Sequence, residues 1–194
     1  MRPRTARRLV IAVVAAIAAA TTLAVVFVGF GAVEQRAPDF TLTDSSGVPF
    51  QLSHHLGHAV ALYFGYTHCP DVCPTTLAAL ARAKHELGAR GSALDVAFIT
   101  VDPARDTPAA LTRYVRLFDP SFFGLGGTPA QLRAAYVAYH IYHQRLPGDS
   151  ASDGYDVGHS SSLTLIGPDG RLRGTDDWDD SADRLAAAIR RMLT

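Results

Sequence analysis

Cysteine is scarce in this sequence, and its charges balance. The 194 residues include only two Cys, too few for a disulfide scaffold, so the fold must depend on a hydrophobic core. Basic and acidic side chains number 18 each, so the chain lacks the net positive charge typical of nucleic-acid-binding proteins, and no nucleic-acid partner is expected. Internal repeats and low-complexity linkers are also missing. The length therefore suits one domain with an appendage.

The N-terminal part of the chain lacks acidic residues before Glu34, and residues 9–33 carry no charge at all. As a helix, this segment would extend roughly 37 Å, enough to cross a hydrocarbon core of about 30 Å. Four arginines precede it and predict a cytoplasmic N-terminus. We expect a basic tip at 1–8, an uncleaved transmembrane anchor at 9–33 and an extracytoplasmic domain at 34–194. Cleavage after small residues near Ala20 is the alternative.

The rest of the chain alternates between apolar stretches and amphipathic stretches. This alternation predicts an α/β domain in which helices cover both faces of a mixed sheet. Functional residues in such sheets gather at the carboxyl ends of strands, where the 66–74 loop is expected. The expected strands are 40–42 and 50–52 (a hairpin), 59–66, 94–101, 162–166 and 171–173, and the expected helices are 75–87 and those beginning after Thr107, Thr128 and Ser181.

Both cysteines lie in one loop, Tyr66–Pro74, between an expected strand and an expected helix. Cys73 falls at the helix start, where backbone amides and the helix dipole stabilise a thiolate. Two thiolates as close in sequence as Cys69 and Cys73 can bind a soft metal ion or form a disulfide. A purely structural disulfide is the alternative, although so short a loop would restrain the unfolded chain little.

A metal ion would need a further ligand, and the chain has eight histidines. His159 stands in a glycine-containing loop, Tyr155–Ser160, just before an expected central strand, so it can approach the cysteine loop. From spacing alone, a metal ligand and an ordinary loop histidine both remain open for His159. The other histidines are expected in a solvated turn (His54, His55 and His58), packed beside the cysteines (His68), or in surface or packing positions (His85, His140 and His143).

The string Cys69-Pro70-Asp71-Val72-Cys73-Pro74 resembles the signature of the Sco/SenC family, copper-binding assembly factors of cytochrome c oxidase. The segments 37–42 and 101–108 resemble further motifs of that family, and Gly158-His159-Ser160 falls where the family carries a copper-ligand histidine. The resemblance covers residues 37–194. It implies a thioredoxin-like fold with an inserted hairpin, in which Cys69, Cys73 and His159 bind one copper ion as Cu(I) or Cu(II).

The function implied by this resemblance is that of a copper metallochaperone in the bacterial inner (cytoplasmic) membrane. It would help to assemble the dinuclear copper site of the oxidase. Its implied partners are the copper-bearing oxidase subunit, a copper donor and a thiol reductant. A thiol–disulfide oxidoreductase that uses Cys69 and Cys73 alone is the alternative. A peroxidase is a third possibility, but the Pro-x-x-x-Thr-x-x-Cys arrangement of peroxiredoxins is missing.

One position departs from the family pattern. Gly158 stands where the family has Asp before the histidine, and Asp156 could replace that brace only if the loop folds back. In the 101–108 segment, we expect a turn in which Asp106 supports the following helix start and Arg105 forms an ion pair. A partner-docking role for this segment is the alternative.

Overall fold

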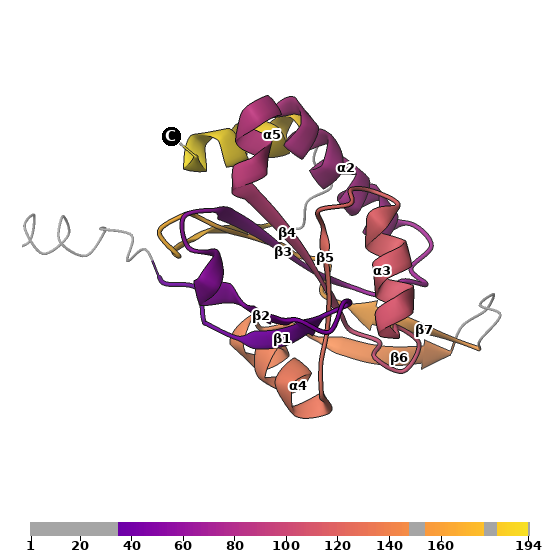
Figure 1. Cartoon of the computed structure of the whole chain (residues 1–194). Coiled ribbons are helices and arrows are strands. Elements are labelled where there is room, and N and C mark those ends of the chain that lie inside the picture. The colour runs from indigo at the N-terminus through magenta and orange to yellow at the C-terminus, as the bar shows by residue number, and fades with distance from the viewer. Residues whose placement is uncertain (1–34, 148–153, 177–181, 194) are drawn as a thin grey trace, which may run out of the picture. The chain divides into compact units, whose positions relative to one another are not determined.

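The computed structural model describes residues 35–147, 154–176 and 182–193. In this part of the chain, a mixed sheet of seven strands lies at the centre, in the order β2-β1-β5-β4-β3-β8-β9 (Figure 1). Its strands are β1 (Thr41–Asp44), β2 (Pro49–Gln51), β3 (Ala59–Gly65), β4 (Leu94–Thr100), β5 (Phe123–Gly126), β8 (Leu163–Ile166) and β9 (Leu172–Asp176). β3, β4 and β5 are parallel, whereas β8 runs antiparallel to β3. The expected mixed sheet is confirmed.

Helices cover both faces of the sheet, because its central strands are apolar on both sides. In β3, Val60, Leu62 and Phe64 pack into one core cluster and Ala61 and Tyr63 into the other. The helices are α2 (Val72–Glu86), α3 (Pro108–Arg116), α4 (Pro129–Ala138) and α5 (Ala182–Met192), with short 3₁₀ turns at Leu52–His55 and Gly88–Ala93. Residues of α4 belong to the first cluster, and residues of α2, α3 and α5 belong to the second.

The helix starts expected at Thr107 and Thr128 are confirmed. The Thr107 side chain accepts a hydrogen bond from the Ala110 amide, so it caps α3. Thr128 and Gln131 form the expected capping box of α4. These caps therefore determine the first residues of α3 and α4.

A second sheet was not predicted by the pattern of residues, although the resemblance to the Sco/SenC family implied an inserted hairpin. It is a hairpin of β6 (His143–Pro147) and β7 (Tyr155–His159), paired antiparallel. The interpretation of 155–160 as a loop was therefore wrong, whereas the expected surface position of His143 is confirmed, since the residue is exposed in β6. Every residue of β6 is exposed, so the segment lacks the apolar alternation that marks a half-buried strand.

Some expectations fall outside the described residues. They include the transmembrane anchor at 9–33 and the Ser181 helix cap. Within the described ranges, no helix has the length and apolar character needed to cross a membrane.

Candidate metal centre

The two cysteines lie at the carboxyl end of β3, as expected. Cys73 is the second residue of α2 and is fully buried, whereas Cys69 in the preceding loop is half-buried. The Cys73 amide donates a hydrogen bond to the Cys69 sulfur over 3.4 Å. From β3, the Tyr63 hydroxyl donates to the Cys73 sulfur over 3.8 Å. The first turn of α2 and the strand β3 thus hold the two sulfurs next to each other.

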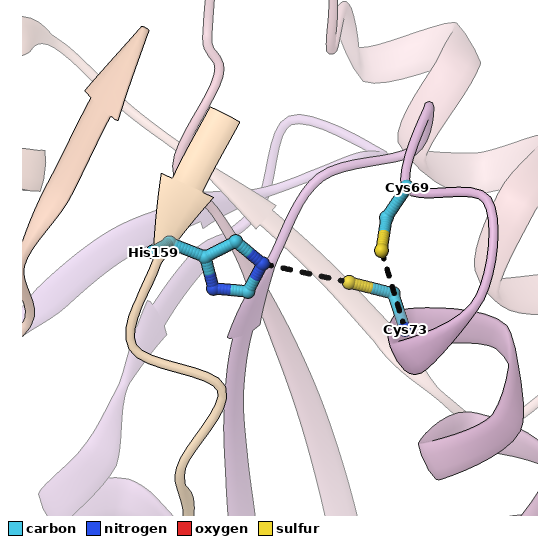
Figure 2. Close-up of side chains that lie close together, drawn as sticks. All are labelled: Cys69, Cys73 and His159. Atoms are coloured by element: carbon cyan, nitrogen blue, oxygen red, sulfur yellow. Dashed lines mark hydrogen bonds between the residues drawn. The ribbon is translucent and has the colours of Figure 1, made fainter. Parts of the chain in front are cut away.

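His159 is the last residue of β7 and faces Cys73. Its Nε2 lies 3.9 Å from the Cys73 sulfur (Figure 2). Its Nδ1 lies 2.9 Å from the Ser160 carbonyl oxygen. A carbonyl oxygen only accepts, so Nδ1 carries the proton and the Nε2 lone pair points toward the sulfurs.

Gly158, the position that departs from the family pattern, lies directly before this histidine. A Cβ there would lie only 2.9 Å from Cδ1 of Leu146, so Leu146 occupies the space of a larger residue. The fold-back that Asp156 would need to replace the missing carboxylate does not occur, because β7 is a regular strand paired with β6. The Ser160 carbonyl, 2.9 Å from Nδ1, braces the imidazole instead.

The two sulfurs differ in their affinity for protons. Hydrogen bonds from the thiol and the backbone amide of Cys73 lower the pKa of Cys69 to about 4 despite partial burial. The hydrogen bond between the two side chains, and burial, raise the pKa of Cys73. At neutral pH the pair therefore shares one proton, with Cys69 as thiolate and Cys73 as thiol.

The three side chains have the geometry to hold a metal ion. One sulfur or nitrogen atom from each of Cys69, Cys73 and His159 lies within 4.8 Å of the others, and the described part of the chain contains no other such group of three His, Cys, Asp or Glu residues. Metal–sulfur and metal–nitrogen bonds of about 2.3 and about 2.0 Å span donors up to roughly 4.6 Å apart, so little closure is needed. Two thiolates with one imidazole are a donor set that suits copper.

A model of the family described as SCO1/SenC matches residues 31–194. This chain belongs to that family. The SCO2 homologue of Bos taurus is 40% identical over 164 residues, which cover 80% of this chain and 61% of that protein. The Homo sapiens SCO2 homologue is 38% identical over 165 residues, covering 80% of this chain and 62% of its own length. The chain therefore spans less than two thirds of these mitochondrial relatives.

Solved structures of other family members share the fold. Bradyrhizobium japonicum ScoI with copper bound has 33% identity and a TM-score of 0.73, over 82% of this chain and all (100%) of that one. Yeast Sco1 with copper bound has 32% identity and a TM-score of 0.71, over 81% of this chain and 87% of that one. The agreement supports the α/β architecture that the resemblance to the Sco/SenC family implied.

In this SCO1/SenC member, Asp106 braces the cysteine loop. Its buried carboxylate accepts hydrogen bonds from the Thr67 amide and hydroxyl and from the Thr100 hydroxyl, the two hydroxyl contacts being 2.6 Å long. The expectation that Asp106 supports the next helix start was wrong, because Thr107 caps α3 and the Asp106 side chain points to the loop instead. No local sequence signal identified this role, because Thr67 and Thr100 lie 39 and 6 residues away from Asp106 along the chain.

A second brace holds the hairpin that carries His159. Arg105 forms the expected ion pair, with buried Asp102, and also donates to the Tyr155 carbonyl over 3.0 Å. Its guanidinium carbon lies 3.8 Å from the centre of the Tyr155 ring, and the Tyr155 hydroxyl donates to Asp102 over 2.9 Å. The 101–108 segment of the SCO1/SenC chain thus touches both parts of the site, a role that the sequence interpretation missed.

Of the other histidines, His143 pairs with His159 across the β6–β7 hairpin and His68 directly precedes Cys69. His55 and His58 both contact Asp95 Oδ2 through Nδ1, at 2.7 and 3.0 Å, and His55 stacks on Phe50. His54 and His58 are exposed in the turn segment before β3, as expected, whereas His55 is partly buried against Phe50. His68 directs its Nδ1 at the Thr67 hydroxyl, 3.0 Å away, and 40% of its side chain is exposed.

Proposed function

We propose that this protein is a copper chaperone that binds one copper ion through Cys69, Cys73 and His159. The observation that carries the proposal is the convergence of two sulfurs and one imidazole nitrogen within 4.8 Å. Thiolates hold Cu(I), and an added imidazole extends the site to Cu(II). The copper-bound structures of Bradyrhizobium japonicum ScoI and yeast Sco1 support the choice of metal.

The site suits a carrier better than a permanent copper centre. It has three donors and one of its sulfurs is only half-buried, so a partner with more ligands has access to the ion. In keeping with the family resemblance, we assign the final acceptor as the dinuclear copper site in the copper-bearing subunit of cytochrome c oxidase. A copper donor and a thiol reductant complete the cycle, because only reduced, deprotonated thiols bind the metal.

Titration of the reduced protein with copper tests the ligand set. We expect one copper per chain for the wild type and at least roughly tenfold weaker binding for Cys69→Ser, Cys73→Ser and His159→Ala. His85→Ala is the matched control, since His85 is exposed on α2. Undiminished affinity in Cys73→Ser would contradict the proposal.

A thiol–disulfide oxidoreductase is the second candidate, and the properties of Cys69 favour it. A half-buried sulfur with a pKa of about 4 is a thiolate at neutral pH and can attack a disulfide, while Cys73 lies beside it to resolve the product. His159 separates the two functions. His159→Ala should abolish tight Cu(II) binding in a carrier, whereas a reductase would retain thiol exchange and maturation of its target.

We place the protein in the bacterial inner membrane, held by the uncharged segment 9–33, with the domain on the extracytoplasmic side. The four arginines before that segment support this orientation. In such an oxidising compartment the cysteine pair tends to close into a disulfide, which is why the proposal includes a reductant.

A further inference from the structure

A second imidazole lies next to His159 on the hairpin. The register of β6 and β7 pairs His143 directly with His159. Directly opposed residues of an antiparallel pair project from the same face, with Cβ atoms about 4.5–5.5 Å apart. The two histidines are 16 residues apart in sequence, yet the pairing places their side chains side by side.

The surroundings of His143 leave its ring available. The residue is exposed, and its ring lies against Tyr136 with 4.6 Å between the ring centres. Within the described ranges, neither of its ring nitrogens has a hydrogen-bond partner. A ring with one packed face and no polar partner can turn about its side-chain bonds at little cost.

When copper is in the Cu(II) state, the metal centre lacks a fourth donor. Two thiolates and one imidazole complete a three-coordinate site, whereas Cu(II) favours tetragonal sites with nitrogen and oxygen donors. Of the nearby groups, the Tyr63 hydroxyl is buried and already donates to Cys73, and His68 Nδ1 contacts the Thr67 hydroxyl. Among the described residues, His143 is a neighbouring nitrogen donor that is both exposed and without a hydrogen-bond partner.

We propose that His143 is the fourth ligand of the divalent copper ion, joining Cys69, Cys73 and His159 when the site holds Cu(II). This inference rests on the proposed copper-binding function. It makes the site sensitive to oxidation state: His143 holds the cupric ion and leaves the cuprous ion on three donors. The site then binds Cu(II) more tightly than three donors alone would allow.

Electron-spin spectroscopy of the reduced protein loaded with Cu(II) tests this assignment. In the wild type we expect hyperfine coupling to two imidazole nitrogens, and in His143→Gln coupling to one. Removal of even an outer-sphere partner of a metal ligand costs roughly 10–100-fold in affinity, so His143→Gln should weaken Cu(II) binding at least tenfold and Cu(I) binding much less. Circular dichroism checks that the hairpin variant is folded.

His68→Gln is the matched control, because His68 is also an exposed histidine and lies next to Cys69 in the chain. Two nitrogens should remain in this variant. The inference is overturned if the wild type shows a single nitrogen, if His143→Gln keeps both, or if His68→Gln loses one. Each of these results leaves copper binding by the other three residues intact, whereas a wild type that binds no copper overturns the proposed function as well.

Discussion

At the scale of single residues, Gly65 provides the space that the Cys73 sulfur occupies. A Cβ at this last position of β3 would lie 2.7 Å from the Cys73 Sγ and 2.7 Å from Cε2 of Phe98. Both neighbours are fully buried and cannot move freely. The metal centre therefore depends on the absence of a side chain at a position that contributes no ligand.

Gly65→Ala should weaken both folding and copper binding. Overpacking of this kind costs about 1–3 kcal/mol, and the displaced sulfur would no longer meet the other donors. Urea unfolding and copper titration measure the two effects. Gly174→Ala is the control, because nothing lies within 4 Å of a Cβ at that strand position. Equal behaviour of the two variants would contradict this account.

The two cysteines should differ in reactivity. In the reduced protein, iodoacetamide should modify half-buried Cys69 well before buried Cys73. The pKa of Cys69 is lowered to about 4, so its thiolate is fully formed above that pH and the rate should be flat from about pH 6 to about pH 8. An ordinary thiol, with a pKa of about 8.5, would instead react faster as the pH rises.

Mass spectrometry of the labelled peptide shows which sulfur reacted. In urea, where the hydrogen bond between the cysteines is lost, both should react and the dependence on pH should return. Equal labelling of Cys69 and Cys73 in the folded protein would be inconsistent with the proton distribution described above.

At the scale of elements, the segment after β4 contacts both parts of the chain that form the site. These parts are the cysteine loop after β3 and the β6–β7 hairpin. Asp106 holds the loop after β3 through Thr67, while Asp102 and Arg105 hold the β6–β7 hairpin through Tyr155. The parallel pairing of β3 and β4 makes this possible, since it brings their carboxyl ends to the same edge of the sheet.

Asp106→Ala should loosen the cysteine loop. It leaves the Thr67 amide and the Thr67 and Thr100 hydroxyls without their acceptor, and loss of hydrogen bonds to a charged group costs about 1.5–3 kcal/mol. We expect a lower free energy of unfolding and faster hydrogen exchange in residues 66–73. Asp119→Ala is the control, because the Asp119 carboxylate accepts hydrogen bonds from nearby, exposed Ser121 and lies outside the cysteine loop. A loop that exchanges equally slowly in both variants would exclude this role.

The sequence predicted those features that depend on residues within one helix, strand or loop. The uniform apolar run of β3, the threonine caps of α3 and α4 and the spacing of the two cysteines all predicted features that the structure contains. The pattern of residues did not predict β6, because all its residues are exposed, or β7, because only Val157 of that strand is buried. The approach of His159 to Cys73 depends on the pairing of these two strands, so spacing along the chain left it open.

At the scale of the whole domain, the metal centre and the point where the described chain begins lie at opposite ends of the sheet. The Gln35 carbonyl accepts from the Leu172 amide, and the Ala37 amide donates to the Gly170 carbonyl. Because Ile166 pairs with Val60, this turn lies at the amino end of β3, while the cysteines follow its carboxyl end. The seven residues of β3 separate the two ends by about 23 Å.

Removal of residues 1–34 should therefore separate membrane attachment from metal binding. We expect the full-length protein to remain in the membrane fraction after a high-salt wash, because an uncharged segment of this length is held by the hydrocarbon core rather than by charge. The shortened protein should appear in the soluble fraction and bind copper with an affinity within about twofold of the full-length value, since the free energy of distant, independent sites adds. A shortened protein that folds, as judged by circular dichroism, but binds copper tenfold more weakly would show that the N-terminal segment contributes to the metal centre. Retention of the shortened protein in the membrane fraction would instead locate the attachment within the domain itself.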